Sequence, residues 1–469
     1  MQKIDVMKST YIKKIHFIGI GGISMSGLAE ILASKGYRIT GSDMRSTPIT
    51  QKLEKIGIKV AIGHNAENAL GSDLVVYTAA VRDSNPELIG AREAGITCID
   101  RATLLGEIMK EYTGSIAVSG THGKTTTTSM VSMIMLEAGL DPTIHIGGEL
   151  EAIGGTTRIG GSRYFIAEAC EYTGSFLKFH PWLAIILNME FDHADYFRDM
   201  DHIRETFTRF AKLVPRDGYL VGCADDPEVM SVLGTVSCNK VTYGINSKNC
   251  TWSASDIVYD DLGCASYTLY NNNTPAAEIK LRVPGIHNVS NSLAAISACS
   301  IMGCGMNAIK EALRKFTGTH RRFELKGITG GIKVIDDYAH HPSEVKATLK
   351  AARNCGQTRV FCVFQPHTYT RTKFLMNEFA EAFDDADEVI LSDIYAAREA
   401  DNGEVNSEML AGRINRREQK ATYLKGFEAI VEYLKVNTRP GDLIITMGAG
   451  DIYKVGEAFL KNRKTLAAG

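Results

Sequence analysis

The chain has 469 residues and a formal net charge of −2; 44% of its residues are hydrophobic and 23% are charged. This length predicts about three globular domains, and the small charge provides no overall field to attract nucleic acid or an anionic membrane. No apolar run approaches the ~18 residues of a membrane span, and the N-terminal MQKIDVMKSTYIKKIHFIGI lacks the apolar core of a signal peptide.

The ten cysteines are scattered along the chain, and none of them forms a CxxC pair. In a chain of this size the pattern is typical of free thiols in a reducing compartment. It predicts a cytoplasmic protein without a disulfide framework or a zinc cluster.

The first segment, to about residue 113, alternates strands with helices. KKIHFIGI, YRITGSD and DLVVYTAA are predicted strands, and MSGLAEILASKG is a predicted helix. This alternation predicts a parallel sheet with helices on its faces.

A glycine-rich turn, GIGGISMSG, follows the first strand and opens the first helix. It is similar to the dinucleotide-binding pattern GxGxxG, although Ser24 stands at the third glycine position. Asp43, about 20 residues further on, is placed where an NAD-dependent dehydrogenase would hold a ribose. A second nucleotide loop downstream argues against that alternative.

That second loop lies in SIAVSGTHGKTTTTSM, between an apolar strand and the start of a helix. Glycine-loop amides can converge on phosphate oxygens, and the helix N-terminus adds positive potential. Lys124 would reach the β- and γ-phosphates, and Thr125 would offer its hydroxyl to Mg²⁺. Val118 stands where the general pattern has its first glycine, so this is a shorter version of the loop. A turn that only caps a helix is the alternative.

The rest of the second segment predicts strands at RYFIAEA and LAIILNM, a helix over 201–213, short antiparallel strands within 244–282 and a helix from Asn291 to Met302. Glu168 and His193 follow the first two strands, at the edge of the sheet where α/β proteins bind ligands. A carboxylate there suits Mg²⁺.

The third segment, after HRRFELKG, returns to α/β alternation. Its predicted strands are GIKVI, RVFCVFQP, EVILSDIY and DLIITMG, with helices from Ser343 and near 373–384.

Six motifs occur in order: GTHGKT, EACE, NMEFDH, GIHNVSN, DDYAHHPSE and FQPHTYTRT. Together they resemble the ATP-dependent Mur ligases of peptidoglycan synthesis, over almost the whole chain. The resemblance implies an α/β fold of three domains. These are a Rossmann-like UDP-sugar domain (1–113), a central P-loop ATPase domain with a small antiparallel sheet (114–322) and a Rossmann-like amino-acid domain (323–469).

The last two motifs are similar to those of the members that join L-alanine to UDP-N-acetylmuramate. The implied reaction uses ATP and Mg²⁺ and passes through an acyl phosphate. The resemblance implies that the protein has no nucleic-acid partner and does not insert into a membrane. It also implies a monomer or a homodimer.

The resemblance also implies residue roles. The catalytic residues would be Lys124, Glu168, His193, Asp337 and Arg371. Thr125 and Glu168 would hold one Mg²⁺, and His193 would help to hold a second. ATP would contact Gly120, Thr121, His122, Gly123, Lys124, Thr125, Thr126, His287, Asn288, Asn291, Arg321 and Arg322. The UDP-sugar would contact Gly19, Gly21, Gly22, Ile23, Ser24, Ser42, Asp43 and His64. Tyr338, His367 and Arg371 would place the amino acid.

Two positions depart from the pattern of many relatives: Cys170 replaces an aspartate and Thr368 an arginine, so neither receives a role. No carbamoylated lysine is proposed, although Lys212 lies nearby. The alternatives are a ligase that recycles a tripeptide onto UDP-N-acetylmuramate, a folate- or cyanophycin-type ligase, and an NTP-hydrolysing regulatory protein.

Overall fold

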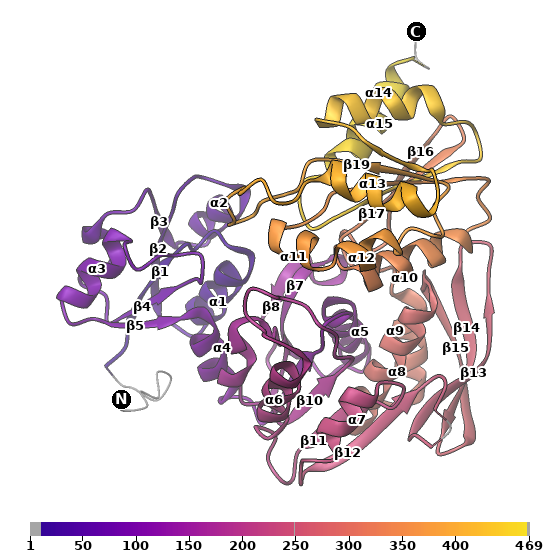
Figure 1. The fold of residues 1–469 in the computed structure, drawn as a ribbon. Helices are drawn as coiled ribbons and strands as arrows, with labels where there is room; N and C mark the ends of the chain where they lie inside the picture. Colours follow the sequence, from indigo (N-terminus) through magenta and orange to yellow (C-terminus); the bar gives the residue numbers. More distant parts are fainter. Residues whose placement is uncertain (1–10, 248, 467–469) are drawn as a thin grey trace.

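The structure is a computed structural model that describes residues 11–247 and 249–466. It contains three sheets, one after another along the chain, which define an N-terminal, a central and a C-terminal domain (Figure 1). The sheets lie within the predicted segments 1–113, 114–322 and 323–469; the boundaries themselves remain predictions.

The N-terminal sheet has the strand order β3-β2-β1-β4-β5 and is parallel throughout. Its strands are β1 (Lys14–Ile18), β2 (Arg38–Asp43), β3 (Lys59–Ile62), β4 (Leu74–Tyr77) and β5 (Thr97–Asp100). Its helices are α1 (Ile23–Ser34), α2 (Pro48–Lys55), η1 (Ala66–Asn68), α3 (Pro86–Glu93) and α4 (Arg101–Met109).

The central sheet has the order β15-β14-β13-β12-β11-β10-β6-β9-β7-β8. Its strands are β6 (Gly114–Ser119), β7 (Thr143–Leu150), β8 (Gly155–Arg158), β9 (Tyr164–Glu168), β10 (Leu183–Ile186), β11 (Tyr219–Cys223), β12 (Asn239–Gly244), β13 (Trp252–Tyr259), β14 (Cys264–Asn271) and β15 (Thr274–Pro284). Its helices are α5 (Lys124–Glu137), η2 (Glu151–Ile153), η3 (Tyr172–Lys178), α6 (Met200–Ala211), α7 (Pro227–Leu233), α8 (Ile286–Ile301) and α9 (Met306–Lys315). The strand β6, which leads into the phosphate loop, is buried along its whole length, as expected for an interior parallel strand.

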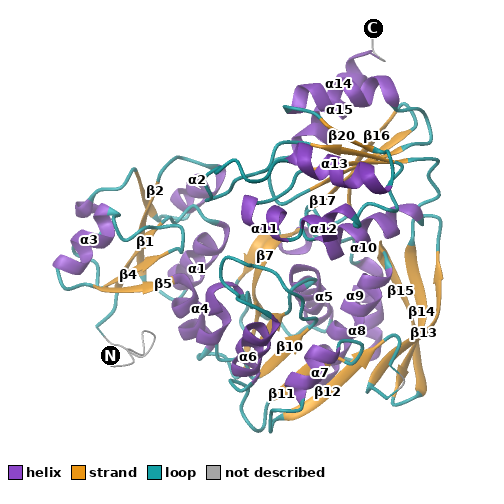
Figure 2. Ribbon diagram, viewed as in Figure 1, coloured by secondary structure: helices purple, strands orange, loops and turns teal. Residues whose placement is uncertain are grey.

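The C-terminal sheet has the order β16-β17-β21-β18-β19-β20, and only β16 is antiparallel. Its strands are β16 (Glu324–Thr329), β17 (Ile332–Asp337), β18 (Val360–Phe364), β19 (Glu388–Leu391), β20 (Ala421–Tyr423) and β21 (Leu443–Met447). Its helices are α10 (Pro342–Arg353), α11 (Tyr369–Phe374), α12 (Met376–Ala380), α13 (Ser407–Arg417), α14 (Phe427–Asn437) and α15 (Tyr453–Leu466). Figure 2 shows the helices flanking the strands of each domain.

One apolar core runs from the N-terminal domain into the central domain. It joins residues of β1, α1 and α4 to residues of β9, η3 and α6. The helix α4 approaches η3 so closely that a Cβ on Gly106 would lie on the carbonyl oxygen of Lys178. The two domains are therefore packed as firmly as elements of one domain.

Three predicted elements differ in the structure. The antiparallel strands β13, β14 and β15 extend the central sheet instead of forming a separate small one, because β13 pairs with β12. The helix α8 begins at Ile286, directly after the turn at Gly285 and before the predicted Asn291. The helix predicted near 373–384 is divided into α11 and α12 at Leu375, whose φ of −101° and ψ of 26° interrupt the helical path.

Among the residues that the structure describes, no helix has both the length and the apolar character to cross a membrane.

Candidate active site

The loop between β6 and α5 has the backbone of a phosphate loop. Gly120 has a φ of 138° and Gly123 a φ of 82°, both in the region that favours glycine. A Cβ on Gly123 would lie 2.6 Å from Oδ1 of Asn291, so the loop also packs tightly against α8. The helix α5 begins at the next residue, and its N-terminal amides are available for an anion.

Lys124 is held across the mouth of this loop. Its Nζ donates hydrogen bonds to the carbonyl oxygens of Gly120 (2.6 Å) and Thr121 (2.9 Å) and pairs with Oε2 of Glu171 at 3.0 Å. Burial opposes the charge of Lys124, but the carboxylate of Glu171 outweighs that effect and raises the pKa. The lysine is therefore a fixed positive charge beside the predicted phosphate site.

Glu168 and Thr125 meet on the other side of the loop. The Thr125 hydroxyl donates to Oε2 of Glu168 at 2.9 Å, and the amide of Gly147 donates to the same oxygen at 3.0 Å. A hydroxyl and a carboxylate at a phosphate loop are the oxygen donors that Mg²⁺ prefers. This donor set fits the predicted ion.

His193 lies near this site but closest to a different carboxylate. Its Nε2 is 3.8 Å from Oε1 of Glu171 and 3.8 Å from Oδ2 of Asp192, and its ring stacks on Tyr172 with 4.6 Å between centroids. Glu171 is buried, and its carboxylate lies between Lys124 and the ring of His193. Sequence reasoning left open whether Glu171 faces the site or the solvent, because a position just after a strand does not fix the direction of the side chain.

A cavity of about 250 Å³ opens from the phosphate loop between the central and C-terminal domains. The predicted residues that line it are His122, Gly123, Thr126, His287, Asn288, Asn291, Arg322 and Asp337. Asn291 donates to Oδ1 of Asn288 at 3.1 Å, and Asn288 donates to the carbonyl oxygen of Pro284 at 2.7 Å. Burial lowers the pKa of His287 to about 4, so its imidazole is neutral, and its Nδ1 has no hydrogen-bond partner within the described chain. The cavity has the polar groups expected of a base and ribose site.

The two arginines at the domain junction diverge. Arg322 lines the cavity and lies over the ring of Tyr338. Arg321 turns into the C-terminal domain, where its guanidinium binds Asp336 at 2.9 Å and the carbonyl oxygens of Gly448 and Gly450. Each guanidinium nitrogen of Arg321 already has a partner in the protein, and the predicted ATP contact of Arg321 stays a prediction.

Asp337 lies at the same junction between the central and C-terminal domains. Its carboxylate accepts backbone hydrogen bonds from Phe323 and Ala339, each at 2.7 Å, and burial raises its pKa to about 6. Tyr338, predicted to place the amino acid, lies instead between Arg321 and Arg322. Tyr338 therefore contacts both arginines, and Asp337 holds the backbone at Phe323, the residue after them.

His122 joins the phosphate loop to the C-terminal domain. Its Nδ1 is 3.1 Å from Oε1 of Glu344 on α10, and its Nε2 is 3.2 Å from Oε2 of Glu190. Burial alone would lower the pKa of His122, but these two carboxylates raise it to about 9. The Ser343 hydroxyl donates to Glu190 at 2.6 Å and lies 3.0 Å from the same imidazole. Glu190, Ser343 and Glu344 were not predicted, since only the tertiary contact brings α10 to this loop.

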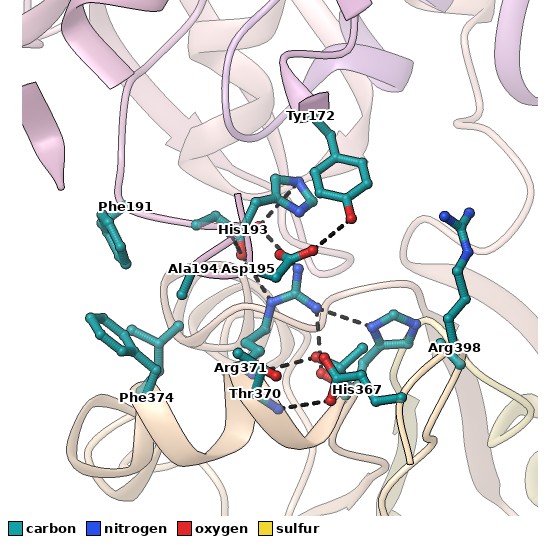
Figure 3. Close-up of a pocket in the computed structure, with 15 residues that line it drawn as sticks. Tyr172, Phe191, His193, Ala194, Asp195, His367, Thr370, Arg371, Phe374 and Arg398 are labelled. Atoms are coloured by element: carbon teal, nitrogen blue, oxygen red, sulfur yellow. Dashed lines mark hydrogen bonds and ion pairs between the residues drawn. The ribbon is translucent and has the colours of Figure 1, made fainter. Parts of the chain in front are cut away.

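A second cavity, of about 280 Å³, lies on the other side of His193 (Figure 3). Arg371 and His367 of the C-terminal domain and Tyr172, Asp192 and His193 of the central domain line it. The residue Asp192 accepts two hydrogen bonds from Arg371, to Oδ1 from Nε at 2.9 Å and to Oδ2 from Nη2 at 3.2 Å. The third nitrogen, Nη1, donates to Nδ1 of His367 at 3.0 Å.

This pairing occupies the guanidinium of Arg371, and the predicted grip of Arg371 on a substrate carboxylate stays a prediction. Both side chains are buried, and all three guanidinium nitrogens are engaged. The pair is an ion-pair clamp between the two domains, and it lowers the pKa of Asp192 despite the burial of that carboxylate. His367 keeps a place at the cavity, with its pKa lowered to about 4 by burial and by the charge of Arg371.

The first glycine loop is separate from these cavities. Gly19 has a φ of 81°, and the amide of Gly21 donates to Oδ2 of Asp43 at 2.9 Å, so Asp43 fixes the loop. Gly22 caps α1, Ile23 is exposed at its start, and Ser24 lies 2.7 Å from Nε2 of His145 in the central domain. The loop thus faces the central domain, with its apolar tip accessible.

Ser42 and His64 share a partner that was not predicted. The Ser42 hydroxyl is fully buried and donates to Oε2 of Glu87 at 2.6 Å, and Nδ1 of His64 lies 3.2 Å from Oε1 of Glu87. The Ser42 hydroxyl thus already has a partner in the protein, and its predicted contact with a nucleotide stays a prediction. His64 is only partly buried, and its role stays a prediction.

Comparison with known families gives three matches along the chain. Residues 14–113 match the model for the Mur ligase family catalytic domain, residues 118–299 the Mur ligase middle domain, and residues 321–450 the Mur ligase glutamate ligase domain. The chain is similar to UDP-N-acetylmuramate–L-alanine ligases of Acetivibrio thermocellus, at 61% identity over the whole of both chains, and of Caldanaerobacter subterraneus, at 54% identity over 98% of this chain and all of that one.

Solved structures give the same result. The UDP-N-acetylmuramate-alanine ligase MurC of Thermotoga maritima aligns with a TM-score of 0.81 at 30% identity, over 96% of this chain and 99% of that one. A murein peptide ligase of Psychrobacter arcticus aligns with a TM-score of 0.70 at 25% identity, over 96% and 98%. The three matched domains, the identity to the curated relatives and the glycine-loop site place this chain in the Mur ligase family.

Proposed function

We propose that the protein joins L-alanine to the lactyl carboxylate of UDP-N-acetylmuramate with the conversion of ATP to ADP and phosphate. The observation that carries this proposal is the position of Glu171 between the two cavities. It pairs with Lys124 of the phosphate loop at 3.0 Å and lies 3.8 Å from His193 of the second cavity. A terminal phosphate in the loop would therefore lie beside a pocket for a second reactant.

The adenosine of ATP occupies the cavity lined by His287, Asn288 and Asn291, and its phosphates lie on the loop amides of residues 120–125. Lys124 and Arg322 are the cations on the two sides of that path. They offset the repulsion between the carboxylate and the phosphate that it must approach.

Thr125, Glu168 and His193 would hold Mg²⁺, with Glu171 beside the histidine. The ion neutralises phosphate charge when it is bound.

The N-terminal domain holds the UDP part at its glycine loop, residues 19–24, where α1 begins. The lactyl carboxylate then reaches the phosphate loop from the side of His145 and Ser24. In the first step a carboxylate oxygen attacks the γ-phosphorus, and ADP leaves. In the second step the neutral amine of alanine attacks the carbonyl carbon of the acyl phosphate. Inorganic phosphate leaves with the electron pair of the broken C–O bond and takes up the proton that the nitrogen loses.

The protein chain contributes mainly by position and by charge. The three reactants are held by three domains, so their approach is governed by how the domains close. The clamp between Asp192 and Arg371 fixes the wall of the amino-acid cavity relative to His193.

We also place the reaction in the cytoplasm, since all ten cysteines are free thiols. A monomer or a homodimer remains the predicted assembly.

Phosphate release tests the proposal. The purified chain is given ATP, Mg²⁺ and UDP-N-acetylmuramate, followed by L-alanine, the cell-wall tripeptide or L-glutamate. Release that depends on both the sugar nucleotide and L-alanine is expected, and hydroxylamine in place of alanine should yield a hydroxamate from the acyl phosphate. Release with the tripeptide alone would favour the recycling ligase, and release without any sugar nucleotide would contradict ligation.

A further inference from the structure

The second cavity contains two arginines, and only one of them is engaged. Among the residues that line it, Arg371 is bound by Asp192 and His367. The cavity carboxylates are also occupied, since Asp195 accepts a hydrogen bond from the Tyr172 hydroxyl at 2.6 Å and Glu399 accepts one from the amide of Thr370 at 2.9 Å. The remaining lining cation is Arg398.

Arg398 has neither a hydrogen bond nor an ion pair with any residue of the described chain, and its side chain is exposed at the cavity. In Figure 3 it stands on the side opposite Phe191 and Phe374, and no dashed line reaches its guanidinium. Burial and Asp195 raise the pKa of Tyr172 to about 12, and the charge of Arg398 opposes this rise, so its field extends across the cavity.

The backbone at Arg398 is nonetheless fixed against the opposite loop. The amide of Thr368 donates to the carbonyl oxygen of Tyr395 and the amide of Tyr395 donates to that of Pro366, each at 2.9 Å. One residue beyond Arg398, the Glu399 carboxylate holds the amide of Thr370. The loops after β18 and β19 are thus joined on both sides of Arg398, and the preceding residue Ala397 has a φ of 52°. A free guanidinium on a fixed backbone is suited to binding an anion.

We propose that Arg398 binds the α-carboxylate of the amino-acid substrate and that Arg371 does not. This inference rests on the proposed ligase reaction. The amine must face the phosphate loop, which lies on the side of His193 and Glu171. The carboxylate of the same small molecule then points to the opposite wall, formed by residues of the C-terminal domain. Thr368 on that wall carries no charge, so Arg398 on the adjoining loop supplies the cation, and a guanidinium can bind a carboxylate through two hydrogen bonds.

The test compares L-alanine with L-alaninamide, which has the same amine and side chain but no negative charge. Phosphate release by the full chain is measured with saturating ATP and UDP-N-acetylmuramate. Arg398→Ala should raise KM for L-alanine by about 10- to 100-fold, because a charge-assisted contact is lost. The kinetic constant for L-alaninamide, as a substrate or as a competitive inhibitor, should change by less than about threefold.

Two further variants separate binding from structure. Lys373→Ala removes a cation from the same region, where Lys373 pairs with Glu404, and should leave KM for L-alanine unchanged. Adding Thr368→Arg to Arg398→Ala places a guanidinium on the adjoining loop and should restore part of the affinity for L-alanine without affecting L-alaninamide. Thermal melting of each variant verifies the fold, and Arg398→Ala should melt as the parent does because it removes no contact.

The inference is overturned if folded Arg398→Ala keeps KM for L-alanine within about threefold of the parent. An equal loss for L-alanine and L-alaninamide would also overturn it, since the effect would not depend on the carboxylate. In both of these cases the parent enzyme still ligates L-alanine, and the proposed function stands. A parent chain that releases no phosphate with L-alanine would overturn both.

Discussion

Lys124 owes its position to groups from two parts of the chain. The carbonyl oxygens of Gly120 and Thr121 and the carboxylate of Glu171 hold its ammonium group at the loop. The motif identified the residue, whereas the Glu171 contact depends on the pairing of β6 with β9. A single side chain thus has a function that the motif predicts and a position that the sheet provides.

Lys124→Ala should lower kcat for ligation by at least about 100-fold, because the charge beside the transferred phosphate is lost. Binding of UDP-N-acetylmuramate, measured by calorimetry without ATP, should stay nearly unchanged because its site belongs to the N-terminal domain. The change leaves the buried Glu171 without its partner, so thermal melting is used to verify that the variant is folded. Loss of sugar-nucleotide binding would contradict this division between domains.

His122 predicts a pH dependence of stability. Its pKa is about 9 in the folded protein against an ordinary value of 6.5, so its contribution is fully present below pH 6.5 and is lost as pH rises through 9. The ATP-free chain should lose up to about 3 kcal/mol of unfolding free energy over this interval relative to His122→Gln. Urea unfolding at a series of pH values measures it.

The exposed His320, replaced in the same way, serves as the control, since it contacts neither Glu190 nor Glu344. An identical pH slope in the parent and in His122→Gln would show that the imidazole is not held between the two carboxylates in solution.

At the scale of elements, the segment after β10 and the helix α11 are joined by one ion pair. Asp192 and Arg371 come from different domains, and both are buried. Beside this ion pair, the ring of Phe374 on α11 packs against Phe191, with 5.0 Å between ring centroids. The clamp therefore sets the angle at which α11 meets the second cavity.

Arg371→Gln should destabilise the protein by about 3 kcal/mol, because it leaves the Asp192 charge buried without a partner. Asp192→Asn together with Arg371→Gln should cost less than the sum of the two single changes. A double-mutant cycle by urea unfolding should give a coupling of at least about 1 kcal/mol. Additive losses would indicate that the two residues do not meet in solution.

At the scale of the whole molecule, the site exists only where the three domains meet. The helix α1 contacts β7 and β8 of the central domain, and a Cβ on Gly27 would lie too close to the Thr157 hydroxyl and 3.0 Å from Nδ1 of His145. Glycine at this position allows the N-terminal domain to dock against the domain that carries the phosphate loop.

Gly27→Val should therefore tilt the N-terminal domain without entering either glycine loop. Ligation should fall by about 100-fold, since small displacements of reacting groups have effects of this size. The dissociation constants for ATP and UDP-N-acetylmuramate, measured separately, should change little. Gly412→Val, on a helix with open space around the added carbon, is the matched control. Equal loss of binding and ligation in Gly27→Val would contradict a purely positional effect.

Prediction from the sequence was accurate wherever the signal is local. The segments 13–36 and 115–130 each show an apolar strand, a glycine turn and a helix with periodic apolar residues. The structure has these elements at those positions. The extension of the central sheet by β13 to β15 was not predicted, because a turn-rich antiparallel segment does not reveal which strand edge it joins. The division between α11 and α12 was missed for a similar reason, since no glycine or proline marks it.

The sequence by itself determined the three α/β units, the two glycine loops and the residue types that surround a transferred phosphate. Only the tertiary structure decided that Arg321 turns away from the nucleotide cavity, that Arg371 is bound by Asp192 and that Arg398 is left free. The physical reason is that the direction in which a charged side chain turns depends on which opposite charge lies within about 4 Å. That neighbour comes from another domain, as many as 179 positions away in the chain, and no local pattern encodes it.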